Sequence, residues 1–491
     1  MTESLGRAVE EAPDGAVGKR GGMALLDGTR VDVVGGGLAG CEAALQLAAR
    51  GARVRLVEMR PDVATPVHTG GGLAELVCSN SLKSTKPDSA AGMLKRELAD
   101  LGSFLLEAAR ACAVPAGGAL AVDRAAFSRW VDERVAAEPG IDVVRGEATG
   151  LAPDGSLMVR QTDDAAARPL SPAPDAVILA SGPLTSDALA AFLQDATGSE
   201  GLAFYDAAAP IVMADSLDMD VLFRQSRYED EGAGDYLNAP FDKAEYERFI
   251  EELLGARRVI AKDFETRELF QACQPIEEIA RKGHDAPRFG PLKPVGLRDP
   301  RTGRRPWAAL QLRAEDAHGA SYNLVGFQTN LAFPEQERVF RMIPGLEHAE
   351  FARFGVMHRN TFVDAPRLLD GTLRLRESVV PVPVRVAGQL SGTEGYCEAI
   401  ASGLHAALYA AAELAGIDAP LPPIETAFGS LVAWATDPAT VDYQPMHVNF
   451  GIIPPLEEKV RNKRDRYAAY AARGAQALEA HVEALQERGL L

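Results

Sequence analysis

The stretch from Val31 to Pro61 constrains the fold of this chain more than any other feature of its sequence. An apolar run, VDVV, leads into the glycine-rich turn GGGLAG, which opens an alanine-rich amphipathic stretch, and a second apolar run ends at Glu58. This order predicts a strand, a tight turn, a helix and a second strand, as in a Rossmann-like unit that binds a dinucleotide. The alternative is a glycine turn that serves packing alone.

Each part of the motif has its own physical role. Gly35 permits the tight turn, Gly37 lets the backbone approach a pyrophosphate, and Gly40 lets helix and strand pack closely. The helix N-terminus offers N–H groups and partial positive charge to the phosphates, and Glu58 is expected to accept hydrogen bonds from a ribose. The predicted cofactor-binding residues of this segment are Gly35, Gly36, Gly37, Leu38, Ala39, Gly40 and Glu58.

A second pattern of strand, glycine turn and helix occupies Val382–Gly416, with AGQLSGTEGY at its turn. It indicates that the chain returns to the nucleotide-binding domain. It also favours FAD over NAD, because the N-terminus of this helix would face a reduced, negatively charged isoalloxazine. We therefore predict that Gly388, Gly392 and Gly395 contact FAD, with ordinary turn chemistry as the alternative.

The order of elements predicts an α/β fold, a doubly wound Rossmann-like FAD-binding domain with an inserted α+β domain. Expected helices include Ser89–Cys112 and Asp123–Ala137, the second with Asp123 as its N-cap. The predicted divisions are a disordered leader over residues 1–30, a first part of the FAD-binding domain over 31–205, an inserted substrate- and RNA-binding domain over 206–330, and a second part with a C-terminal helix over 331–491.

Composition narrows the class of protein. The chain is 47% hydrophobic and 24% charged, as expected for a globular protein that buries large cores. It has no apolar run long enough for a membrane span and no cysteine spacing typical of zinc sites, so we expect neither a membrane nor a metal. The odd number of cysteines, five, favours a reducing, cytoplasmic location. Nothing in the sequence implies a protein partner.

Two of the cysteines lie in unusual surroundings. Cys78 lies within the polar run LAELVCSNSLKS, and Cys273 precedes a proline-initiated helix in FQACQPIEEIARKG. A helix N-terminus and nearby cations lower the pKa of a thiol, so both are candidates for catalysis, with a structural role as the alternative. Cys41, Cys112 and Cys397 lie in Ala- and Leu-rich helical stretches, where core packing is the better interpretation.

A net charge of −18 argues against a general affinity for nucleic acid, but one segment is locally basic. Between Arg281 and Arg305 the cationic residues far outnumber the acidic ones, and Phe289 and Trp307 are candidates for stacking on bases. A solvated loop is the alternative. The predicted RNA-binding residues are Arg281, Lys282, Arg288, Arg301, Arg304 and Arg305.

Several longer motifs together closely resemble one family. They are GGGLAGCEAA, EMRP, AELVCSNSLKS, ACQPIEEIARKGHDAPRFGPLKPVGL, YNLVGFQTNL, AGQLSGTEGY and PMHVNFGIIPP. The chain resembles TrmFO, the family of bacterial folate- and FAD-dependent tRNA (uracil-5-)-methyltransferases. The resemblance implies methylation of C5 of a T-loop uridine in tRNA, forming 5-methyluridine. Its implied cofactors are FAD, which carries the methylene, 5,10-methylenetetrahydrofolate as carbon donor, and NADH or NADPH as reductant.

The resemblance also implies roles for the two candidate thiols. The thiolate of Cys273 would add to C6 of the uracil and make C5 nucleophilic, and Cys78 would be the thiol beside the flavin. The chain departs from the usual pattern at Gly36, at Cys41 and at Gln274, which directly follows Cys273. Three other hypotheses about the function are open at this point. The protein could be a related enzyme acting on rRNA or a wobble uridine, a small-molecule NAD(P)H flavin oxidoreductase, or a non-catalytic flavoprotein that binds tRNA.

Overall fold

The computed structural model describes residues 25–65, 67–162, 164, 166–198, 202–227, 234–260, 274–377, 379–440 and 443–491. Most of the predicted leader, residues 1–24, therefore lies outside the described residues, and so does Cys273. The described end of the predicted leader packs into the protein. Leu26 is buried, and its backbone N–H donates to the carbonyl of Arg50 at 2.9 Å.

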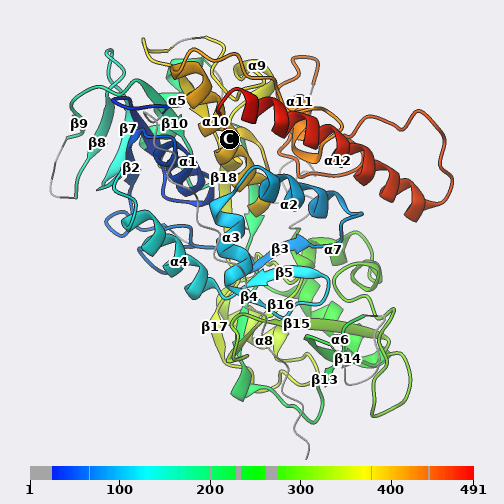
Figure 1. Ribbon diagram of the computed structural model, residues 1–491. Coiled ribbons are helices and arrows are strands. Elements are labelled where there is room, and N and C mark those ends of the chain that lie inside the picture. Colours follow the sequence, from blue (N-terminus) through cyan, green and yellow to red (C-terminus); the bar gives the residue numbers. More distant parts are fainter. Residues whose placement is uncertain are drawn as a thin grey trace, which may run out of the picture.

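A five-stranded parallel sheet with the order β19-β10-β1-β2-β6 forms the centre of the larger lobe (Figure 1). Its strands are β1 (Arg30–Val34), β2 (Arg53–Glu58), β6 (Ile141–Arg145), β10 (Ala176–Leu179) and β19 (Val384–Val386). Side chains along a strand alternate between its two faces, and in β1 Val33 enters one hydrophobic core while Val34 enters another. Both faces of the sheet are therefore covered, as in a doubly wound fold.

Helices cover one face, and a small sheet with a helix covers the other. On the first face α1 (Leu38–Ala49) crosses α10 (Tyr396–Leu414) so closely that a Cβ at Gly403 would lie 2.2 Å from the carbonyl oxygen of Ala39. The opposite face packs against β7 (Glu147–Leu151), β8 (Leu157–Arg160) and α5 (Asp187–Thr197). The exposed β9 (Arg168–Pro169) pairs with β8 in the same small sheet.

The other elements of this lobe frame the sheet. They are β3 (Ser81–Ser84), α2 (Ala90–Asp100), α3 (Phe104–Ala111), β4 (Ala113–Val114), β5 (Ala119–Val122), α4 (Arg124–Ala136), α9 (Ala365–Leu368), η5 (Gly388–Ser391), α11 (Ala427–Ala435) and α12 (Lys463–Glu487). The Asp123 carboxylate accepts the Ala126 N–H at 2.9 Å, which confirms the predicted N-cap. None of the helices in the described ranges is both long enough and apolar enough to cross a lipid bilayer.

The prediction of a single helix over Ser89–Cys112 is wrong. The chain turns at Gly102, whose φ of +73° favours glycine, and the Ser103 hydroxyl accepts the N–H of Leu106 at 3.2 Å to start a second helix.

The middle unit is a separate α+β lobe, as the sequence predicts. Its six-stranded sheet has the order β13-β14-β15-β16-β12-β17, and neighbouring strands are antiparallel. Its elements are β12 (Ile211–Met213), η1 (Ala214–Ser216), β13 (Phe223–Arg224), β14 (Tyr236–Phe241), α6 (Lys243–Gly255), α7 (Ile276–Arg281), η4 (Ala286–Phe289), β15 (Ala308–Ala314), β16 (Ser321–Leu324), α8 (Phe333–Phe340) and β17 (Phe351–Arg353). Because α8 packs in this core and β17 pairs in this sheet, the expected boundary at residue 330 falls within the unit.

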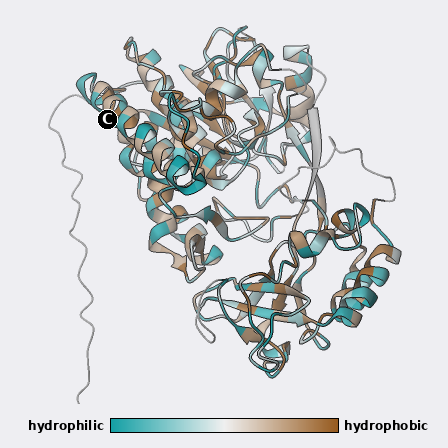
Figure 2. Cartoon of the chain, turned by 90° about the vertical axis from the view of Figure 1, so that its right-hand side faces the viewer, coloured by the Kyte–Doolittle hydropathy of each residue, from teal (hydrophilic) through white to brown (hydrophobic). Residues whose placement is uncertain are grey.

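Several contacts join the lobes. Strand β11 (Leu202–Ala207) pairs with β18 (Met357–Phe362), and Figure 2 shows the middle unit as a distinct lobe with hydrophilic residues along the outside of its helices. The Asn80 side chain donates to the carbonyl of Ala314 at 2.9 Å and accepts from Arg313 at 2.7 Å. The polar loop that carries Cys78 is thus fixed at the junction between the lobes.

Candidate active site

The β1–α1 turn has the shape that its three glycines permit. Gly35 has a φ of +98°, and a Cβ there would lie 2.4 Å from the carbonyl oxygen of Ala180. A Cβ at Gly40 would lie 1.8 Å from the carbonyl oxygen of Gly35, so helix and turn need glycine at both positions. A Cβ at Gly37 would meet nothing within 4 Å, and no side chain caps the N-terminus of α1 there. The helix N-terminus is therefore open to a ligand.

The carboxylate of Glu58, which the sequence assigns to a ribose, is already bound within the protein. It accepts the N–H of Gly36 at 2.6 Å, the N–H of Arg60 at 2.9 Å and the Arg60 Nε at 2.9 Å. Arg60 also contacts Glu75 at 3.0 Å. A carboxylate has about four lone-pair sites, so Glu58 retains room for a ligand hydroxyl. Arg60 and Glu75 were not predicted from the sequence.

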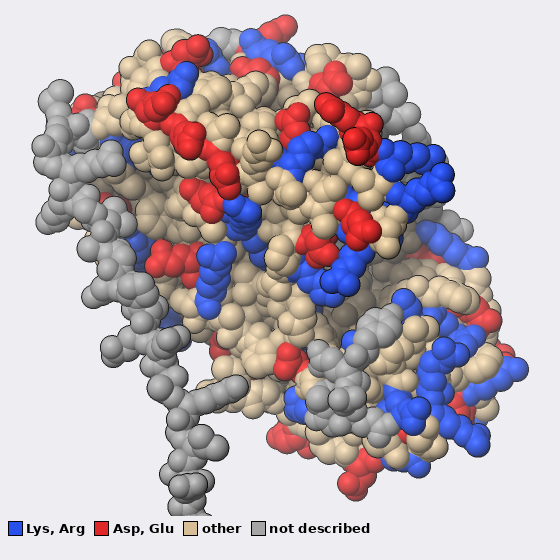
Figure 3. All heavy atoms as spheres, turned by 45° about the vertical axis from the view of Figure 1, so that its right-hand side comes forward, with Lys and Arg blue, Asp and Glu red and all other residues tan. Residues whose placement is uncertain are grey.

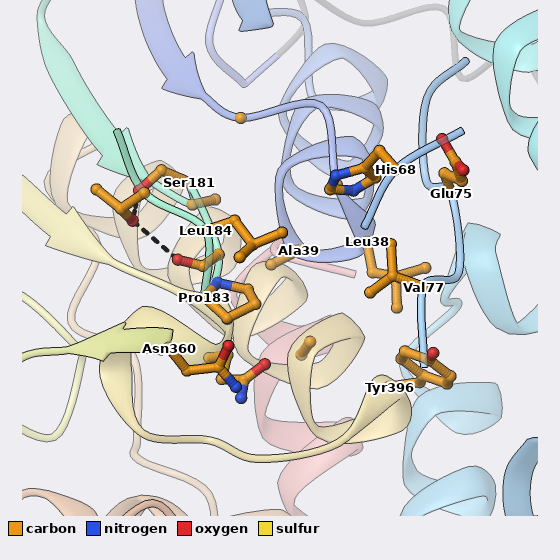
Figure 4. Close-up of a pocket in the computed structure, with 18 of the residues that line it drawn as sticks. Leu38, Ala39, His68, Glu75, Val77, Ser181, Pro183, Leu184, Asn360 and Tyr396 are labelled. Carbon is orange, nitrogen blue, oxygen red and sulfur yellow. Dashed lines mark hydrogen bonds between the residues drawn. The ribbon is translucent and has the colours of Figure 1, made fainter. Parts of the chain in front are cut away.

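Both glycine segments face one cavity of about 450 Å³, within the usual size range of small-molecule sites. Figure 4 shows its walls: Leu38 and Ala39 from the start of α1, Ser181, Pro183 and Leu184 from the loop after β10, Asn360 from β18 and Tyr396 from the start of α10. The predicted residues that line the cavity are Gly35, Gly37, Leu38, Ala39, Glu58, Cys78, Gly388 and Gly395.

Three predicted cofactor residues lie outside this lining. Gly36 and Gly40 shape the turn behind it. A Cβ at Gly392 would lie 2.0 Å from the Tyr443 hydroxyl oxygen, so this glycine allows a close approach to Tyr443.

The second glycine segment lines the cavity up to the N-terminus of α10. Its N-cap is Gly395, with a φ of +119° and no side-chain cap, so backbone N–H groups and partial positive charge face the cavity. Gln389, six residues earlier in η5, lines the cavity, and within the described part of the chain its buried Nε2 has no hydrogen-bond partner. A buried donor of this kind fits a ligand that supplies the acceptor.

The loop that carries Cys78 is hydrogen-bonded to the first residue of the same helix, Tyr396. The hydroxyl oxygen of Tyr396 accepts the N–H of Cys78 at 3.0 Å and the N–H of Ser79 at 3.1 Å. Burial, together with the nearby Cys78, raises the pKa of Tyr396, so its hydroxyl stays protonated. The half-buried Cys78 is therefore held at the cavity wall by backbone contacts.

Lys83 and His447 line the cavity near this loop and are not among the site residues predicted from the sequence. Lys83 Nζ lies 3.0 Å from Oε1 of the buried Glu398. Burial alone would lower the pKa of Lys83, but the Glu398 carboxylate outweighs it and raises that pKa. Burial and the charge of Lys83 lower the pKa of His447, which is therefore neutral at pH 7. The unusual φ of +65° at Lys83 has no signal in the sequence.

Cys273 lies outside the described residues, but the chain that follows it is placed next to the cavity. The Ile276 N–H donates to the carbonyl of Gln328 at 2.8 Å, and Gln328 lines the cavity. The side chain of Gln274 accepts from Lys282 Nζ at 2.6 Å, so this departure from the family pattern contacts a predicted RNA-binding residue.

The other cysteines pack in the core of the larger lobe. Cys41 and Cys397 are buried there, and Cys112 packs against it. Burial raises the pKa of all three thiols, that of Cys397 to about 11, so they remain protonated and unreactive at neutral pH.

The predicted RNA-binding residues lie in the middle unit, where Lys and Arg side chains gather on the surface shown in Figure 3. Arg281, Lys282, Arg304 and Arg305 are exposed, and Arg301 is exposed but pairs with Asp299 at 3.1 Å. Arg288 lies over the ring of Trp307 at 3.7 Å and donates to its carbonyl at 3.0 Å. Arg288 therefore occupies one face of the indole that was expected to stack on bases.

The chain is similar to known proteins over most of its length. A family model described as Glucose inhibited division protein A matches residues 30–418. A protein of Geobacter sulfurreducens named Methylenetetrahydrofolate--tRNA-(uracil-5-)-methyltransferase TrmFO is 52% identical over 449 residues, which cover 91% of this chain and 98% of that protein. A protein of the same name from Thermosynechococcus vestitus is 50% identical, with 93% of this chain and 95% of that protein covered.

Among solved structures, Aquifex aeolicus GidA in its form II crystal matches with a TM-score of 0.67 and 17% identity, covering 94% of this chain and 74% of that chain. This likeness shows a shared fold. The family resemblance predicted from the sequence motifs is confirmed by the extent and identity of the curated matches. The chain belongs to the TrmFO family.

Proposed function

We propose that this protein transfers a one-carbon unit from 5,10-methylenetetrahydrofolate to C5 of a uridine in the T-loop of tRNA, with FAD as carrier and NADH or NADPH as reductant. The names of its relatives support the folate donor and the tRNA uracil substrate. A cytoplasmic location fits the reduced thiols at Cys41, Cys112 and Cys397.

The residues around the cavity fit FAD. The open N-terminus of α1 would hold the pyrophosphate, and the open N-terminus of α10 would favour negative charge on the reduced ring. The buried Gln389 Nε2 supplies a donor without a described acceptor. Bound FAD would supply the carrier and electron-transfer chemistry, which no amino-acid side chain provides.

The single observation that carries the proposal is the convergence of three segments on one cavity. The dinucleotide turn, the Cys78 loop and Gln328 all line it, and Gln328 holds the backbone of Ile276, three residues after Cys273. A uridine entering from the middle unit would therefore meet the Cys78 loop on one side and the segment that begins at Gln274 on the other.

The two cysteines have different roles in this proposal. The Cys273 thiolate adds to C6 of the uracil, which turns C5 into a nucleophile, and it leaves after C5 has lost its proton. Cys78 lies on the cofactor side, fastened through Tyr396 to the start of α10.

The test is turnover by purified protein supplied with FAD, NADPH, methylenetetrahydrofolate and an unmodified tRNA transcript. The wild-type protein should form 5-methyluridine, and Cys273→Ala should form none while it retains FAD. Cys112→Ala, outside the cavity lining, is the matched control and should keep both properties. Full turnover by Cys273→Ala would remove the proposed role of that thiol.

A further inference from the structure

The side chain of Phe289 is unusually exposed. At 82%, it is the most exposed of the large hydrophobic residues that the structure describes. Single exposed hydrophobic residues are common on protein surfaces, so exposure alone carries no function. Whether the exposed Phe289 ring binds a partner depends on how its backbone is held and on the charges around it.

The turn that presents Phe289 is held from both sides. Its neighbour Arg288 is fixed by the Trp307 ring at 3.7 Å and by the Trp307 carbonyl at 3.0 Å. Pro287 is buried, and its carbonyl accepts the N–H groups of Gly290 at 3.1 Å and Leu292 at 2.8 Å. The ring of Phe289 is thus presented by an ordered η4 turn, which lowers the entropic cost of placing a partner on it.

Cationic side chains lie near Phe289, and two of them also contact acids: Arg288 lies 3.5 Å from Asp285, and Arg281 lies 3.5 Å from Glu278. Helix α7 packs against the η4 turn and ends with the exposed Arg281, which Lys282 follows. Protein-binding surfaces have cores depleted in charged residues, whereas an aromatic ring among cations is typical of single-stranded nucleic-acid sites. The charges therefore favour RNA over a protein as the partner.

The same surface connects with the segment of the candidate nucleophile. Lys282 contacts Gln274 at 2.6 Å, and Gln274 directly follows Cys273 in the chain. A nucleotide placed on this surface would lie one short helix, α7, away from Gln274.

We propose that Phe289 stacks on an unpaired base of the tRNA substrate, close to the target uridine, and so positions the strand for reaction. This inference rests on the function proposed above, because it takes the RNA to be the substrate of the same site. Phe289 is a positioning residue: the ring holds the RNA and takes no part in bond making.

The test compares Phe289→Ala with Phe289→Trp in binding to an unmodified tRNA transcript. Stacking predicts that Phe289→Ala weakens tRNA binding by about 5- to 150-fold, and that Phe289→Trp retains it. The new indole should lose fluorescence as tRNA is added, beyond the change seen with the wild-type protein and its three native tryptophans. Binding of a blunt double-stranded RNA, which offers no unpaired base, should be equal in wild type and Phe289→Ala.

Met219→Ala is the matched control, because Met219 is 53% exposed in the same lobe but lies between Asp218 and Asp220. It should bind tRNA like the wild type. Equal tRNA affinity of Phe289→Ala and Met219→Ala, or an indole at position 289 that tRNA does not quench, overturns the stacking proposal. Methyl transfer is measured separately: its absence in the wild type would refute the proposed function, whereas the binding results decide the stacking.

Discussion

A single methyl group added at Gly37 should weaken FAD binding without weakening the fold. Gly37 has a φ of −79°, which any residue adopts, and an added Cβ would meet no protein atom within 4 Å. Alanine also restricts the unfolded chain. We therefore expect the free energy of unfolding of the apoprotein to be unchanged or to rise by about 0.4–1 kcal/mol in Gly37→Ala.

The same methyl group would occupy the space beside the α1 N-terminus where the pyrophosphate is proposed to lie. Loss of one hydrogen bond to a charged phosphate costs about 1.5–3 kcal/mol. The Kd for FAD should therefore rise by about 10- to 150-fold.

Gly40→Ala is the contrasting variant. Its Cβ would lie 1.8 Å from the Gly35 carbonyl oxygen, so the turn must distort, at a cost of about 1–3 kcal/mol or more in stability. Urea unfolding of the apoproteins measures stability, and quenching of flavin fluorescence on titration measures affinity. Wild-type FAD affinity in Gly37→Ala would refute the placement of the pyrophosphate at this helix end.

Two further predictions concern pH and salt. Glu97 accepts the N–H groups of Ala427 and Phe428, and burial raises its pKa to about 7 from an ordinary 4.5. Its contribution to stability is therefore full below about pH 4.5 and is lost as pH rises to 7, a change of about 3 kcal/mol at most. Glu97→Gln should flatten the fall in urea-unfolding free energy over this window, and an unchanged slope would contradict the assignment. Replacing Arg304 and Arg305 by glutamine should weaken tRNA binding and lower the slope of log affinity against log salt by about 1 for each phosphate that the variant no longer binds. Equal slopes would show that these exposed side chains do not touch the RNA.

Turns and helix caps could be predicted from the sequence because they depend on residues that are close together in the chain. The glycine turn before α1 and the Asp123 cap of α4 need only nearby residues, and both form as predicted. The break between α2 and α3 also had a local signal, a glycine followed by serine, which the continuous apolar pattern obscured.

The rest of the site depends on tertiary contacts. The hydrogen bond between Asn80 and Arg313 joins segments far apart in the chain, and so does the hydrogen bond from the Cys78 N–H to the Tyr396 hydroxyl oxygen. No periodicity encodes such pairs. The contact between Arg288 and the Trp307 ring likewise depends on how the loop folds. The sequence therefore predicted RNA contacts for both residues without showing that they contact each other.

The origin of the transferred carbon tests the central claim most directly. Purified protein with FAD, NADPH and tRNA would receive methylenetetrahydrofolate labelled in its one-carbon unit, alongside unlabelled S-adenosylmethionine, and the tRNA nucleosides would be read by mass spectrometry. The account predicts labelled 5-methyluridine in the T-loop. An unlabelled methyl group, with label appearing only when S-adenosylmethionine carries it, would contradict the account.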